Sequence, residues 1–149
     1  MKSVIVSIAL IQKRDAGRTR WLLLEKNDEL QFIVSDCLES ESFREAAIRE
    51  VAWQLNLDRR RDILVANMSQ LSIDFKEPTS FGCNRYVALA FYNVHVHKQR
   101  VVDLLSAKKS VVWVSAAELC AGICDKGRRI HPEIVGWINK YEVVRPWQF

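Results

Sequence analysis

Hydrophobic and polar positions along this 149-residue chain follow patterns that predict a series of strands. Residues 3–12 are β-branched and apolar on both faces, which is typical of a buried strand. Residues 20–26 have a similar pattern, and the turn residues at 15–17 predict that the two strands form a hairpin. The short apolar segment at residues 31–34 is counted as a third strand, and three further strands are predicted at residues 62–75, 84–97 and 110–114.

Helical periodicity is clearest over residues 42–56, where apolar positions recur every four residues. Ser42 and Glu45 have the spacing of a capping box at its start. Ser115 marks a second helix start, and Pro132 stands at the favoured first turn of a last helix. The resulting order, β-β-β-α-β-β-β-α-α, predicts an α/β chain with a mixed sheet and helices packed on it.

Composition limits the class of protein. The chain is 49% hydrophobic and 27% charged, which is ordinary for a globular protein. Its length suits one domain spanning residues 1–149. No stretch approaches the roughly 20 apolar residues needed to cross a membrane. The four cysteines have no Cys-x-x-Cys spacing, so we expect reduced thiols and a cytoplasmic location.

The net charge of +4 and the pI of about 9.0 are compatible with an anionic ligand. The clearest basic run is Arg59, Arg60 and Arg61, which is bracketed by Asp58 and Asp62. We expect this run to form a solvated loop.

Residues 35–57 resemble the signature of the Nudix superfamily, the hydrolases of nucleoside diphosphates linked to another group. The family pattern is Gly-x5-Glu-x7-Arg-Glu-U-x-Glu-Glu-x-Gly-U, where U is aliphatic. The matching residues are Glu41, Arg49, Glu50, Val51 and Leu57. Residues 112–119 are similar to the family's late strand and following helix. The resemblance implies a Nudix-type α/β/α sandwich and metal-dependent hydrolysis of a pyrophosphate.

The chain departs from that pattern at several positions. Trp53 and Gln54 replace its two adjacent glutamates, and Ser35 and Asn56 replace two of its glycines. The Gly-Glu step that precedes the helix is here Ser40 and Glu41. The Nudix box is therefore degenerate.

Mg²⁺ prefers hard oxygen ligands, and carboxylates at positions i, i+3 and i+4 share one face of a helix. Here those positions hold Glu50, Trp53 and Gln54, and an indole offers only an N–H donor. We therefore expect weak or no pyrophosphohydrolase activity. The alternative is an active hydrolase with a displaced Mg²⁺ or Mn²⁺ site. Acidic residues that could build it are Glu39, Glu41, Glu45, Glu50, Asp74, Glu77 and Asp103.

The box residues each have more than one interpretation. Glu50 is a residual metal ligand or general base, or else holds the loop at residues 34–38. Arg49 orients a substrate, pairs with Glu45 or Glu50, or stacks on Trp53. Trp53 plugs the former metal pocket, stacks on a nucleobase or anchors a protein interface, and with Gln54 it forms the predicted ligand site. If a metal binds, Glu50 and Glu41 are its predicted ligands.

Outside the box, His95 and His97 are two residues apart, and a solvent-facing strand is the better interpretation than a zinc site. Trp137, Trp147 and Phe149 form a latch folded on the domain or, if exposed, a surface for a homodimer. The predicted function is that of a nucleotide- or RNA-binding module or a protein-interaction module. DNA is not an expected partner, because no helix-turn-helix segment is evident.

Overall fold

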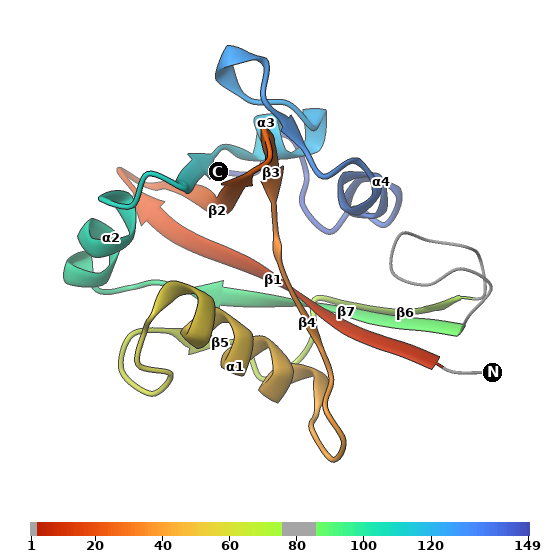
Figure 1. The fold of residues 1–149 in the computed structure, drawn as a ribbon. Coiled ribbons are helices and arrows are strands. Elements are labelled where there is room, and N and C mark those ends of the chain that lie inside the picture. Colours follow the sequence, from red (N-terminus) through yellow and green to blue (C-terminus); the bar gives the residue numbers. More distant parts are fainter. Residues whose placement is uncertain (1–2, 76–85) are drawn as a thin grey trace. The chain divides into compact units, whose positions relative to one another are not determined.

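The computed structural model describes residues 3–75 and 86–149, and Figure 1 shows the order of their elements. The strands are β1 (Ser3–Asp15), β2 (Arg18–Lys26), β3 (Glu29–Gln31), β4 (Ile33–Asp36), β5 (Leu64–Val65), β6 (Leu71–Phe75), β7 (Tyr86–His95), β8 (Val111–Val114) and β9 (Arg129–Ile130). The helices are α1 (Phe43–Leu55), α2 (Gln99–Ser106), α3 (Ala116–Ala121) and α4 (Pro132–Lys140), with a 3-10 turn at Asp125–Gly127. The predicted combination of a mixed sheet with helices is confirmed. Within the described residues, none of the helices is long and apolar enough to cross a bilayer.

The chain divides into two compact units that share β1. The first unit comprises residues 1–10 and 33–94. In it, β4 runs antiparallel to β1, with Val6 opposite Asp36, and β6 runs antiparallel to β7. Helix α1 packs against β4. Its buried residues Ala46, Ala47, Val51 and Leu55 form the apolar face that the periodicity predicts.

The second unit comprises residues 11–32 and 95–149. The end of β1 and β2 form the predicted antiparallel hairpin, and β8 pairs with β2. Strand β3 continues this sheet and pairs in parallel with β9. Helix α3 packs on β2 and α4, and α2 contacts β8. The core of this unit includes Trp21, Leu23 and Ile134, each at most 1% exposed.

Local signals explain where the helices begin. Both predicted starts at Ser42 and Ser115 have a complete capping box, because the serine side chain and the third helical residue exchange hydrogen bonds. Helix α4 begins at Pro132 as predicted. Helix α2 has no such signal, since Lys98 makes no side-chain cap, and this helix was not predicted.

The predicted strand at residues 62–75 is instead two strands, β5 and β6. The segment between them still follows β7, because the Ala66 amide donates to the Asn93 carbonyl and the Gln70 amide to the Phe91 carbonyl. The polar residues of this segment break the alternation that a continuous strand needs. Residues 76–82, which carry turn residues between the predicted strands at 62–75 and 84–97, lie outside the described residues.

Candidate ligand groove beside helix α1

Arg49 connects α1 to the segment that precedes it. Its Nε lies 2.9 Å from Glu41 Oε2 and its Nη2 lies 3.0 Å from Glu41 Oε1, which is a two-point contact. Nη2 also donates to the Asp36 carbonyl at 2.8 Å. The loop-holding role considered for Glu50 therefore belongs to Arg49.

The same contacts set the charge of Glu41. The hydrogen bonds from the Arg49 guanidinium and from the Leu38 amide lower the pKa of the Glu41 carboxyl. The Glu41 carboxylate in turn raises the pKa of Arg49. Both groups are therefore ionised at neutral pH, and the Glu41 oxygens are engaged by protein donors.

Glu50 is also engaged by its neighbours on α1. Arg49 Nη1 lies 3.0 Å from Glu50 Oε2, and Gln54 Nε2 donates to Glu50 Oε1 at 2.8 Å. The predicted pairing of Arg49 with Glu50 is confirmed. The predicted pairing with Glu45 is wrong, because the Glu45 carboxylate accepts from the Ser42 amide in the capping box.

Trp53 is 77% exposed, so its interpretation as a plug of a former metal pocket is wrong. The reason is its place on α1: the buried face is at Val51 and Leu55, and Trp53 stands on the other side of the helix. Its indole is therefore available for contact with another molecule.

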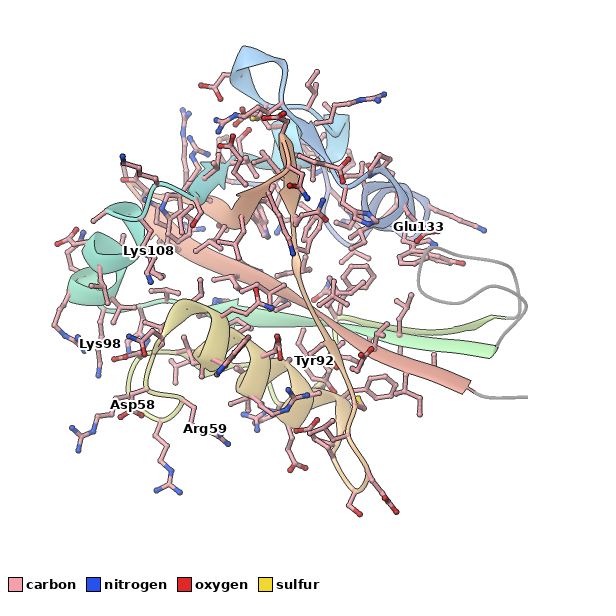
Figure 2. The ribbon with its side chains drawn as sticks, in the orientation of Figure 1. Asp58, Arg59, Tyr92, Lys98, Lys108 and Glu133 are labelled. Atoms are coloured by element: carbon pink, nitrogen blue, oxygen red, sulfur yellow. The ribbon has the colours of Figure 1, made fainter. Side chains whose placement is uncertain are left out.

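A shallow groove of about 490 Å³ runs beside this face of α1. The residues that line it are Arg49, Glu50, Ala52, Trp53, Leu57 and Arg59. Figure 2 shows Arg59 next to Asp58 in the loop that follows the helix. Arg59 was predicted to lie in a solvated loop, and its place in this groove was not predicted. Its position directly after the helix was the signal that could have indicated it.

The loop after α1 is built by two aspartates. Asp58 Oδ1 accepts from the Arg60 amide at 2.9 Å and from the Arg61 amide at 3.3 Å. The buried Asp62 accepts from the Asp58 amide at 2.8 Å. These bonds form a tight turn, which leaves Arg59, Arg60 and Arg61 exposed as predicted.

The donor set on α1 does not fit a Mg²⁺ site. Mg²⁺ requires several oxygen ligands in octahedral geometry. Glu50 is the one carboxylate at the three box positions, and Arg49 and Gln54 already donate to it. Among the acidic residues considered for a displaced site, Asp103 accepts from Gln99 at 2.7 Å. The side chains of Asp74 and Glu77 lie outside the described residues.

A second group of side chains has the composition of a possible metal site. Within the described residues, Glu118, Cys124 and Asp125 bring three potential ligand atoms within 4.8 Å of one another. Glu118 already accepts from the amides of Ser115 and Asp125, and Arg128 lies 3.7 Å from Asp125. Capping and ion pairing account for this group, so it does not form a convincing cation site.

The remaining candidates lie in the second unit. His95 and His97 are both exposed, as predicted. The aromatic tail is tied to the β1–β2 hairpin through its backbone, because the Phe149 carbonyl accepts from Thr19 Oγ1 at 2.9 Å. The side chains of Trp147 and Phe149 are nevertheless 70% and 74% exposed, so the aromatic rings do not form the predicted latch. The predicted homodimer surface stays a prediction.

Comparison with solved structures identifies the fold. A C. elegans Ap4A hydrolase matches with a TM-score of 0.65 and 14% identity, over 95% of this chain and 97% of that chain. A mutT/nudix family protein from Listeria innocua matches with a TM-score of 0.64 and 13% identity, over 93% and 91% of the two chains. This chain has the Nudix fold. The likeness also includes Shewanella oneidensis NrtR complexed with a 27mer DNA, with a TM-score of 0.59 and 9% identity over 93% of this chain and 61% of that one.

Comparisons of the sequence with protein-family models and with curated proteins found no match. The backbone keeps one feature of the Nudix pattern that the residues have lost. Two positions where the Nudix pattern has glycine keep a left-handed backbone here, with φ of 66° at Ser40 and 54° at Asn56. Asn56 ends α1 in this conformation. The turns that flank the Nudix helix are therefore present without the glycines that usually make them.

Proposed function

We propose that this Nudix-fold chain binds a nucleotide or a short RNA in the groove beside α1 and has weak or no pyrophosphohydrolase activity. The observation that carries the proposal is the state of Glu50, whose two oxygens accept from Arg49 and Gln54. A carboxylate engaged in this way, next to an amide and an indole, is a poor ligand for Mg²⁺.

The same groove has the chemistry of a nucleotide site. An exposed indole such as that of Trp53 can stack on any nucleobase, because every base has a π-face. Arg59 lines the groove beside it and can contact a phosphate with its guanidinium. Such an aromatic platform next to a basic side chain favours an anionic, base-containing ligand over an apolar peptide.

The first test concerns the metal. A metal that binds the folded state must raise the melting temperature. We expect millimolar Mg²⁺ or Mn²⁺ to leave the melting temperature of the wild type unchanged, and to leave that of Glu50→Gln unchanged as well. We also expect a panel of dinucleotides to stay intact. A melting shift that Glu50→Gln abolishes, together with turnover of a dinucleotide, would establish the alternative, an active hydrolase of the kind named in the Ap4A hydrolase match.

The second test concerns the ligand. Titration with nucleotides and with single-stranded RNA should quench tryptophan fluorescence, and Trp53→Leu should remove the quench and weaken binding about tenfold or more. Trp147→Leu is the matched control, because Trp147 is exposed to a similar degree and does not line the groove.

Several outcomes would contradict the proposal. An unchanged quench in Trp53→Leu would mean that the nucleotide does not stack there. Binding of a protein but of no nucleotide or RNA would favour the interaction-module interpretation. Duplex DNA serves as a comparison, and we expect it to bind more weakly than the single strand, since a duplex keeps its bases stacked.

A further inference from the structure

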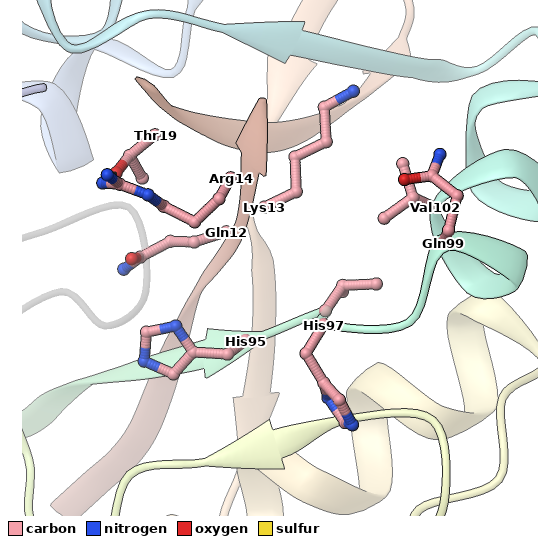
Figure 3. Close-up of a pocket in the computed structure, with 9 residues that line it drawn as sticks. Gln12, Lys13, Arg14, Thr19, His95, His97, Gln99 and Val102 are labelled. Atoms are coloured by element: carbon pink, nitrogen blue, oxygen red, sulfur yellow. The ribbon is translucent and has the colours of Figure 1, made fainter. Parts of the chain in front are cut away.

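A second pocket lies entirely in the second unit, beside the ends of β1 and β7 and the start of α2 (Figure 3). Its volume of about 390 Å³ is within the range of small-molecule sites. It shares no lining residue with the groove beside α1. The ionisable side chains that line it are Lys13, Arg14, His95 and His97, and no carboxylate is among its lining residues.

The two histidines are held in place by backbone pairing. The Val96 amide donates to the Gln12 carbonyl at 2.8 Å, which continues the sheet beyond the end of β7. Val96 is 3% exposed and anchors this segment in the core, while His95 and His97 on either side of it are exposed. Their rings therefore belong to a rigid segment and remain accessible to a ligand.

Arg14 is held just as firmly. Its Nη1 donates to Thr19 Oγ1 at 2.9 Å and its Nη2 donates to the Gly17 carbonyl at 2.9 Å. Arg14 and Thr19 also donate to the Phe149 carbonyl. Arg14 and Thr19 are register partners across the β1–β2 hairpin, so the sheet itself orients the guanidinium.

The lining also supplies neutral donors. The side-chain amides of Gln12 and Gln99 stand on different sides of the pocket in Figure 3. Lys13 extends away from the histidines, with its Nζ 4.4 Å from the centre of the Trp113 ring. Its charge contributes to the local field. Gln99 Nε2 donates to Asp103 Oδ1 at 2.7 Å, and the exposed imidazoles of His95 and His97 are accessible to a ligand.

We propose that this pocket binds a small anion that carries phosphate groups. Two cationic side chains, Lys13 and Arg14, and two imidazoles line the pocket, and the Asp103 carboxylate that accepts from Gln99 at 2.7 Å is not among the lining residues. Such a lining favours an anion, because phosphate oxygens accept hydrogen bonds from histidine and are attracted by the two cations. This proposal is independent of the groove beside α1.

The test uses the histidine rings as reporters, with inorganic pyrophosphate as the probe. The chain has three histidines, and the third, His131, caps α4 by accepting from the Ile134 amide and does not line the pocket. We expect pyrophosphate to move the ring proton signals of His95 and His97 in a saturable way and to leave the His131 signal in place. The variants His95→Gln and His97→Gln assign the signals.

Affinity measurements complete the test. The double variant His95→Ala/His97→Ala should weaken pyrophosphate binding about tenfold, because it removes two hydrogen-bonding side chains from the pocket. Lys109→Gln is the matched control, since Lys109 is exposed in the same unit and lines neither this pocket nor the groove beside α1. It should bind pyrophosphate as the wild type does.

Two further arms identify the recognised group. ADP should move the same two histidine signals as pyrophosphate, and adenosine should not. Equal shifts with adenosine, equal movement of His131, or an unchanged affinity in the double variant would each overturn the proposal. Trp53→Leu should leave these histidine shifts intact, so failure of the α1 groove and failure of this pocket are distinguishable.

Discussion

Ser40 and Asn56 hold the left-handed backbone angles at the two ends of the Nudix helix segment. A left-handed conformation costs an ordinary residue about 1–2 kcal/mol, and asparagine tolerates it better than serine. We expect Ser40→Gly to raise the free energy of unfolding by about 0.5–1 kcal/mol after the entropy cost of glycine. Asn56→Gly should be close to neutral. Urea denaturation measures both effects.

Ser35 gives the matched control for that prediction. It also replaces a glycine of the Nudix pattern, but it lies 3% exposed in β4, where the backbone is extended. Its hydroxyl donates to the Ser7 carbonyl at 3.4 Å. Ser35→Gly should therefore lower the free energy of unfolding by about 1 kcal/mol. An increase in the free energy of unfolding in Ser35→Gly would contradict the extended backbone assigned to Ser35 in β4.

The Arg49–Glu41 contact predicts a dependence of stability on pH. The pKa of Glu41 is lowered in the folded state, so its contribution is fully present above the ordinary carboxyl pKa of 4.5 and is lost as the pH falls through the lowered value. We expect Glu41→Gln to be less stable than the wild type at pH 7, with the difference shrinking under acid. A difference that stays constant down to about pH 3 would contradict this linkage.

At the scale of elements, two glycines near the end of the chain have opposite roles. Gly122 ends α3 with φ of 74°, and a Cβ there would lie 3.3 Å from Val135 Cγ1. Gly136 lies inside α4, and a Cβ there would have no neighbour within 4 Å. Gly122→Ala should lower the free energy of unfolding by about 1–2 kcal/mol. Gly136→Ala should raise it by about 0.8–1 kcal/mol, because alanine has the higher helix propensity. Thermal or urea unfolding of the pair checks both signs.

The elements that the sequence predicts well are those with a signal in their own residues. The capping boxes at Ser42 and Ser115 and the proline at Pro132 mark three helix starts, and each is confirmed. Helix α2 has buried Val101 and Leu105 four residues apart, but it has no side-chain cap that separates it from a loop. Its formation depends on packing against β8, which a local pattern does not contain.

In the candidate site, too, some features follow from local sequence signals and others depend on packing. The sequence indicates that Glu50, Trp53 and Gln54 share a face of one helix, because that follows from helical spacing. The exposure of Trp53 and the place of Arg59 in the groove depend on how α1 packs and where the following loop turns. The pocket at His95 and His97 could not be predicted from the sequence, for a different reason. It joins residues that are about eighty positions apart in the chain, and periodicity carries no information at that separation.

At the scale of the whole molecule, the net charge of +4 predicts the response of both proposed sites to salt. Exposed charges are screened over about 10 Å at 0.1 M salt. The affinity for pyrophosphate and for ADP should therefore fall several-fold between about 50 mM and about 200 mM sodium chloride. Binding of adenosine to the α1 groove, measured by tryptophan quenching, should change little. Calorimetry at the two salt concentrations tests the phosphate ligands.

The path of the chain between the two compact units determines which truncated fragments can fold. The polypeptide passes between the two compact units after Leu10, after Phe32 and after Val94, so no single cut separates them. A fragment that stops at Val94 keeps every residue of the first unit. It also keeps β2 but deletes β8, the strand that pairs with it from Trp21 to Leu24. In that fragment β2 has lost its hydrogen-bonding partner β8, and we expect its unpaired edge to cause aggregation.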